Sequence, residues 1–133
     1  MSLIDHIEFA VKDAEVSKQF YEQALKPLGI HLVVTIPSEK TRTGGKRYGF
    51  GQKGYPILWI HDKDAEQSVL HLALKTERRE IVDAVWDAAI KAGGRDYGKP
   101  AIRHLYHDHY YAAYILDPDG NNLEIVCQSK TLI

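Results

Sequence analysis

The feature that most constrains the fold of this 133-residue chain is an internal repeat. A shift of 65 residues places His6 on His71 and superposes a strand-like pattern, a helix-like pattern and the glycine that ends it. Matched positions over a strand, a helix and a stop signal indicate two copies of one structural unit. The other matched positions are Ile7 with Leu72, Phe9 with Leu74, Phe20–Tyr21 with Val85–Trp86, Ala24–Leu25 with Ala89–Ile90, and Gly29 with Gly94.

Each copy is predicted to be a βαβββ unit. Asp13 is a favourable N-cap for a helix over 14–25, and Thr76 for the second helix. The sequence of Asp117–Gly120 is typical of a type I turn with a bulge, which predicts a hairpin. We predict strands over 3–11, 30–37, 47–51, 55–61, 69–75, 110–116 and 122–127.

The predicted architecture is therefore α+β, with one domain over residues 1–133. Its two βαβββ modules, residues 3–61 and 68–128, are expected to form a curled mixed sheet around a metal-binding groove. In each module the apolar face of the sheet is expected to lie under the helix, and the opposite face to line the groove.

Composition excludes several classes of protein. Apolar residues make up 44% and charged residues 26%, as in ordinary globular proteins. The net charge of −1 and the absence of a basic stripe give a nucleic-acid or membrane partner no electrostatic support. The lone Cys127 excludes a disulfide scaffold and predicts a cytoplasmic protein.

Three residues on the predicted groove faces indicate a metal centre. Glu124 lies in the middle of a strand between Leu123 and Ile125, and packing does not explain an acidic residue there. His6 and His71 lie on the corresponding faces by the two-residue period of a strand. Two imidazoles and one carboxylate can hold a divalent ion and leave positions open for substrate.

The last predicted hairpin supplies further groove residues. A one-residue bulge at its turn pairs Tyr114 with Glu124 and Ala112 with Val126. Tyr114 is therefore expected beside the carboxylate, and Tyr110 shares its face nearer the rim. Together with Ala112, these residues are candidates for contact with a substrate.

The first module offers candidates of less certain role. Glu8 shares the face of His6 and is read as a fourth ligand, a general base, a partner that orients a histidine, or a surface residue. Trp59 occupies the repeat position of Glu124, where it either stacks on substrate or belongs to the core. His61 lies on the same face two residues further on and could serve as a ligand.

For two groups of basic residues the sequence leaves two interpretations open. Each is either a solvated surface segment or a contact for an anionic substrate. The irregular spacing of the histidines argues against a second metal site. The groups are His104, His107 and His109 with Arg103, and Arg42, Lys46 and Arg47 around Gly44–Gly45.

The chain resembles the vicinal oxygen chelate superfamily, which includes glyoxalase I, extradiol dioxygenases, fosfomycin-resistance thiol transferases and bleomycin-binding proteins. The resemblance covers essentially the whole chain. It implies a glyoxalase-like fold, a divalent metal ion on His6, His71 and Glu124, and a homodimer that binds a small molecule. The residues that carry it are Asp5–Ile7, Phe20–Tyr21, His71–Leu74 and Asp117–Glu124.

Within that superfamily the residues favour a metal-dependent enzyme. Glyoxalase I has a fourth, acidic ligand where this chain has Trp59, so the chain resembles the branches with three ligands. We expect a glyoxalase-like lyase, isomerase or thiol transferase that acts on a small oxygenated substrate by electrophilic metal catalysis. Tyr114 and Glu8 are the expected catalytic residues; Trp59, His61, Tyr110, Ala112 and His107 are expected to bind substrate.

The alternatives are an Fe(II) extradiol-type dioxygenase and a small-molecule-sequestering protein of the antibiotic-resistance type. The donor set does not choose among Zn, Ni, Mn and Fe. The intact set of His6, His71 and Glu124 argues against the sequestering alternative.

Overall fold

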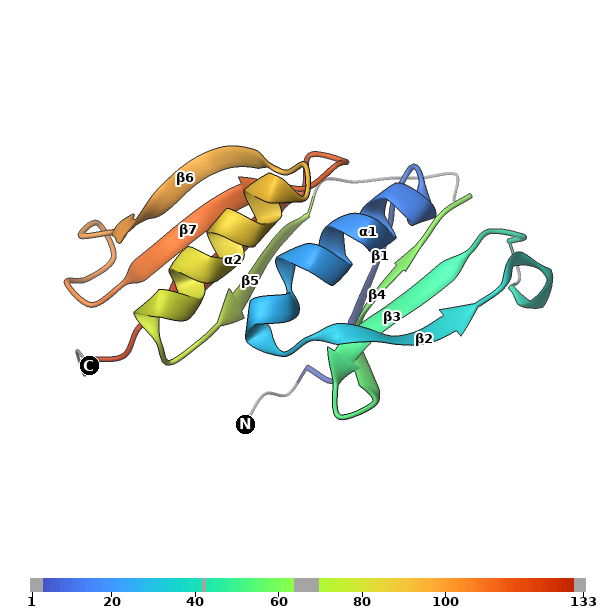
Figure 1. Cartoon of the computed structure of the whole chain (residues 1–133), viewed down its shortest axis with the longest axis horizontal. Helices are drawn as coiled ribbons and strands as arrows, with labels where there is room; N and C mark the ends of the chain where they lie inside the picture. The colour runs from blue at the N-terminus through green and yellow to red at the C-terminus, as the bar shows by residue number, and fades with distance from the viewer. Residues whose placement is uncertain (1–3, 42, 64–69, 131–133) are drawn as a thin grey trace.

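Two four-stranded sheets, each with one helix, make up the chain (Figure 1). The computed structural model describes residues 4–41, 43–63 and 70–130. The first module contains β1 (Ile7–Ala10), α1 (Ala14–Ala24), η1 (Lys26–Leu28), β2 (His31–Ile36), η2 (Ser38–Lys40), β3 (Arg47–Gln52) and β4 (Tyr55–His61). The second contains β5 (His71–Lys75), α2 (Arg79–Lys91), β6 (Arg95–Ile102), β7 (Tyr111–Leu116) and β8 (Asn122–Cys127).

The strand registers confirm the repeat. The sheet orders are β1-β4-β3-β2 and β5-β8-β7-β6, so each strand has its counterpart in the other module. The parallel pair Ile7↔Leu58 recurs 65 residues later as Leu72↔Leu123. Two βαβββ modules are thus confirmed. The predicted module boundaries at positions 3 and 68 lie outside the described residues.

Local chemistry explains most of the element boundaries. Asp13 caps α1 as predicted, because its carboxylate accepts from the backbone N–H groups of the next turn. The β3–β4 turn has positive φ at Lys53 and Gly54, as a two-residue type I′ hairpin turn requires. Thr76 does not cap α2: its hydroxyl accepts from the Arg78 N–H, and the helix begins at Arg79.

The sequence patterns did not indicate β6. This strand lies at the edge of its sheet and contains Gly98 and Pro100, which are uncommon inside strands. Its pairing with β7 shifts register at two places, so no regular alternation survives in the sequence. An edge position tolerates both features because half of its backbone groups need no ladder partner.

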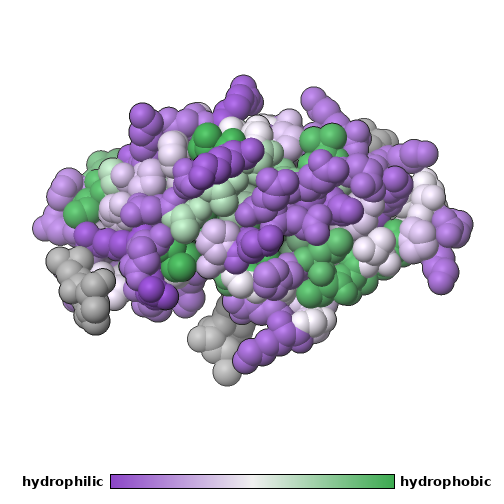
Figure 2. All heavy atoms as spheres, viewed as in Figure 1, coloured by the Kyte–Doolittle hydropathy of each residue, from purple (hydrophilic) through white to green (hydrophobic). Residues whose placement is uncertain are grey.

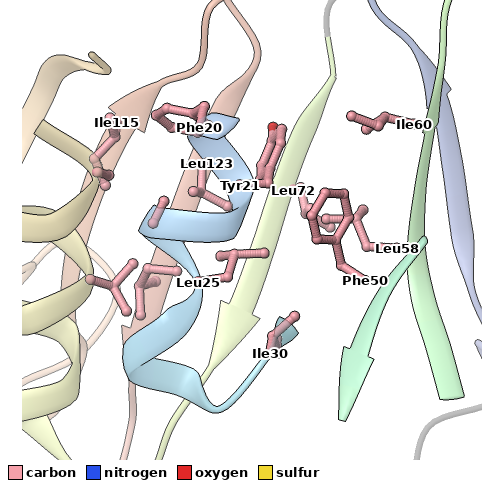
Figure 3. Close-up of a cluster of buried hydrophobic side chains, with 14 of the residues drawn as sticks. Phe20, Tyr21, Leu25, Ile30, Phe50, Leu58, Ile60, Leu72, Ile115 and Leu123 are labelled. Atoms are coloured by element: carbon pink, nitrogen blue, oxygen red, sulfur yellow. The ribbon is translucent and has the colours of Figure 1, made fainter. Parts of the chain in front are cut away.

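Helix α1 lies between the two sheets and gives them a shared core (Figure 3). Its stripe of Phe20, Tyr21 and Leu25 is at most 1% exposed. Burial of this stripe therefore stabilises both modules at once. The side chains around it are Phe50, Leu58 and Ile60 of the first module and Leu72, Ile115 and Leu123 of the second (Figure 3).

The two sheets remain open toward each other. In Figure 1, β1 and β5 run in opposite directions, and each is the edge strand of its own sheet. A largely apolar hollow of about 510 Å³ lies between them. The face that carries the helices is mostly polar (Figure 2). Among the described residues, no helix is long and apolar enough to cross a membrane.

Candidate active site

The second module brings a histidine and a carboxylate together on the face opposite α2. His71 Nε2 of β5 lies 2.9 Å from Glu124 Oε1 of β8. The Glu124 residue is only 3% exposed, whereas the His71 side chain is 56% exposed. Glu124 is therefore more enclosed than the sequence suggested, and His71 covers it on the solvent side.

Two tyrosines surround this pair. The Tyr110 hydroxyl donates to Glu124 Oε2 at 2.5 Å, so both carboxylate oxygens have partners. Tyr114 lies opposite Glu124 in the β7–β8 ladder, as predicted from the turn, and its ring centroid is 6.4 Å from that of His71. The guanidinium carbon of Arg103 lies over the Tyr114 ring, 5.1 Å from its centroid.

The electrostatics keep both phenols protonated. Burial and the hydrogen bond to Glu124 raise the pKa of Tyr110 well above its ordinary value. Burial, and then the negative charge of Glu124, raise the pKa of Tyr114. A phenol that keeps its proton at neutral pH can donate a hydrogen bond to an oxygen on which negative charge develops.

The first module carries its own histidine–carboxylate pair, at different repeat positions. Glu8 of β1 accepts from Arg47 Nε at 3.0 Å and Nη2 at 2.8 Å, and its Oε2 lies 2.7 Å from His61 Nδ1. The hydrogen bonds from Arg47 lower the pKa of the Glu8 carboxyl. Arg47 also stacks on Trp59, with 3.9 Å from its guanidinium carbon to the ring centroid.

His6 lies elsewhere within the same chain. Its Nδ1 is 2.7 Å from Asp5 Oδ2, and Asp5 also accepts from the Tyr55 hydroxyl at 2.5 Å. His6 lines the hollow between the sheets together with Leu72–Lys75 of β5, whereas neither His71 nor Glu124 lines it.

The structure therefore does not gather His6, His71 and Glu124 within one chain. In residues 4–41, 43–63 and 70–130, no group of three or more His, Cys, Asp or Glu is placed to hold a metal ion. Of the predicted ligands, only His71 and Glu124 are neighbours.

The remaining predicted site residues are Ala112 and His107. Ala112 is fully buried, and its carbonyl accepts from Arg103 at 3.2 Å. His107 is exposed, with its Nε2 3.0 Å from Gln128 Oε1 and its ring edge-on to Tyr110. The sequence did not indicate the stacking of Arg47 on Trp59, because a register shift in β3 places Arg47 opposite His61.

Comparisons with known proteins identify the family and the fold. A family model described as the Glyoxalase/Bleomycin resistance protein/Dioxygenase superfamily matches residues 3–125. The chain belongs to this superfamily. A search of curated proteins gives no match.

Solved structures share the fold. A glyoxalase/bleomycin resistance protein from Albidiferax ferrireducens has a TM-score of 0.70 at 27% identity, with 95% of this chain and 98% of that chain covered. A glyoxalase/bleomycin resistance protein/dioxygenase family enzyme from Burkholderia phytofirmans has a TM-score of 0.67 at 20% identity, with 95% and 98% covered. A glyoxalase I mutant from Zea mays has a TM-score of 0.72 at 20% identity, with 92% and 46% covered.

Proposed function

We propose that this protein is a metal-dependent, glyoxalase-like enzyme that acts on a small oxygenated molecule. The observation that carries the proposal is the His71–Glu124 pair, which is enclosed by Tyr110 and Tyr114 on the open face of the second module. A nearly buried carboxylate beside an exposed imidazole is poorly explained by packing.

The donor chemistry fits a divalent metal ion. Imidazole and carboxylate suit Zn, Ni, Mn and Fe, so these remain the proposed metals. The third ligand is His6, and because His6 does not join the His71–Glu124 pair within the described part of one chain, we assign it to a second copy of the chain. A homodimer would also cover the edge strands β1 and β5 and the apolar hollow between them.

Each side chain then has a physical role. The ion, when bound, stabilises negative charge on adjacent substrate oxygens. Tyr114 donates a hydrogen bond to the oxygen that becomes anionic, and Tyr110 holds Glu124 in place from behind. Glu8, ionised at neutral pH, orients His61 and Arg47 for contact with the substrate. Trp59 forms the wall behind Arg47, the buried Ala112 supports the site from below by accepting a hydrogen bond from Arg103, and His107 lies at the rim.

One observation favours a second candidate, a protein that sequesters a small molecule without a metal. The described part of one chain offers only a two-residue donor set. Metal analysis of the purified protein after incubation with Zn, Ni, Mn or Fe(II) separates the two candidates. The enzyme is expected to retain about one ion per chain, and Glu124→Gln to retain none. Wild-type protein that retains none of the four metals would support the sequestering candidate instead.

A further inference from the structure

A second hollow of about 510 Å³ lies on the first module, and neither His71 nor Glu124 lines it. It lies where the β2–β3 connection, with η2, passes the ends of β1 and β4. Its polar lining includes Lys40, Thr41, Arg47, His61 and Glu8. A hollow of this size accommodates a small molecule or one end of a larger ligand.

The charges in this hollow do not balance. Glu8 is matched by Arg47, which it binds through both carboxylate oxygens. The positive charge of Lys40 is not matched, because Lys40 makes no ion pair in the part of the chain that the structure describes. His61 adds a further group that carries a positive charge when it is protonated. The hollow is therefore a place of surplus positive charge on a chain whose net charge is −1.

Arg47 is fixed in advance of any ligand. Its Nε and Nη2 bind Glu8, and its guanidinium plane lies on Trp59. Its Nη1 is not used by these contacts. A guanidinium that is already oriented loses little conformational freedom when it binds an anion.

Thr41 and Gly45, which line the hollow from the β2–β3 connection, are also held in place by their contacts. The Thr41 hydroxyl bonds to the carbonyl groups of Ser38 and Gly45, at 3.0 and 2.6 Å. The Lys46 N–H donates to Asp62 at 2.8 Å. A Cβ at Gly45 would collide with the backbone carbonyl of Asp62, so only glycine allows this close approach. Lys40 is thus next to a threonine whose side chain is held by two hydrogen bonds.

We propose that this hollow binds the anionic group of a small molecule, a carboxylate or a phosphate, through Lys40 and Arg47. That the bound molecule is a substrate rests on the proposed enzymatic function, whereas binding of the anion does not. The site lies on module one, so it requires neither His71 nor Glu124.

Calorimetric titration of the metal-free, full-length protein tests the proposal. Inorganic phosphate and acetate serve as separate probes at constant ionic strength. The probe with the lower dissociation constant shows whether the hollow prefers a phosphate or a carboxylate. We expect saturable binding of at least one probe, weakened about tenfold or more by Lys40→Gln. Arg47→Lys, which keeps a partner for Glu8, is expected to weaken binding as well. Phosphate or acetate should also change the emission of Trp59, and Trp59→Phe should remove that change.

Lys26→Gln is the matched control. Lys26 lines another hollow, together with His31 but without an arginine, and its loss should leave anion binding unchanged. Absence of saturable binding for both probes, or an equal loss of affinity in Lys26→Gln, would overturn the proposal. Because no metal is present, a failure of anion binding is separate from a failure of the metal site.

Discussion

The hydroxyl of Tyr21 donates a 2.6 Å hydrogen bond to Asp117, which joins α1 of the first module to the β7–β8 turn of the second. Asp117 is 2% exposed and also accepts from the Asn121 side chain and from the backbone N–H groups of Asp119 and Asn121. The turn that carries the superfamily resemblance therefore has a structural task, to hold the two modules together.

Replacement of Tyr21 by Phe should weaken the fold. The change removes one of four donors to a buried carboxylate, and we expect the free energy of unfolding to fall by about 1–3 kcal/mol. Urea denaturation measures this loss. Tyr111→Phe is the control, because Tyr111 donates a similar bond to Asp83 at an exposed position. Equal losses in the two variants would contradict the role given to Asp117.

The same hydroxyl should limit stability at alkaline pH. Burial, and then the nearby charge of Asp117, raise the pKa of Tyr21 well above 10.0, so the folded state holds this proton more tightly than the unfolded state. The stabilisation is present below pH 10 and is lost as the pH rises beyond it. We expect the melting temperature of wild type to fall more steeply than that of Tyr21→Phe between pH 9 and 11. Parallel curves would show that Tyr21 is not the group responsible.

Glu8 should have the opposite pH dependence. Its pKa is lowered by Arg47, so it stabilises the folded state above its ordinary value of 4.5, and this stabilisation disappears as the pH falls through the folded value. Glu8→Gln is expected to flatten the decline in melting temperature below pH 4.5. The exposed Glu77→Gln controls for the loss of one negative charge, and it should decline as wild type does.

Replacement of Tyr114 by Phe separates catalysis from metal binding. The variant should keep its metal content and lose about 10- to 1000-fold in turnover of a substrate found by screening, because the hydroxyl donates to a developing anion. Tyr97→Phe, at an exposed position on β6, should have normal turnover. Loss of metal from Tyr114→Phe would show that the hydroxyl acts on the ligands instead.

The sequence predicts relationships within a strand or across a short turn. Tyr114 and Glu124 could be placed opposite each other because the turn between them fixes the register of their hairpin. The same reasoning fails for Arg47. A two-residue turn alone pairs it with Ile60, but the irregularity between Phe50 and Gly51 moves it opposite His61.

Strand periodicity and turn sequences do not determine how the two modules are arranged in space. The two-residue period places His6 and His71 on corresponding faces, but it says nothing about the relative direction of β1 and β5. These strands run in opposite directions (Figure 1), and within one chain the side chain of His6 pairs with Asp5, whereas that of His71 pairs with Glu124. A site that needs both residues then requires a second copy of the chain.

The most direct test of the central claim is a mixing experiment with His6→Ala and Glu124→Gln. The amide introduced by Glu124→Gln can accept a hydrogen bond from Tyr110 and donate one to His71, and the side chain of His6 is half-exposed. Both variants should therefore fold as wild type does, which circular dichroism would check. We expect neither variant alone to bind Zn tightly in calorimetry. After unfolding and refolding together, mixed dimers should contain one site with His6 of one chain and an intact His71–Glu124 pair of the other. High-affinity Zn binding at about a quarter of the wild-type stoichiometry is the predicted result. No recovery of tight binding in the mixture, although wild type binds Zn, would contradict the shared site.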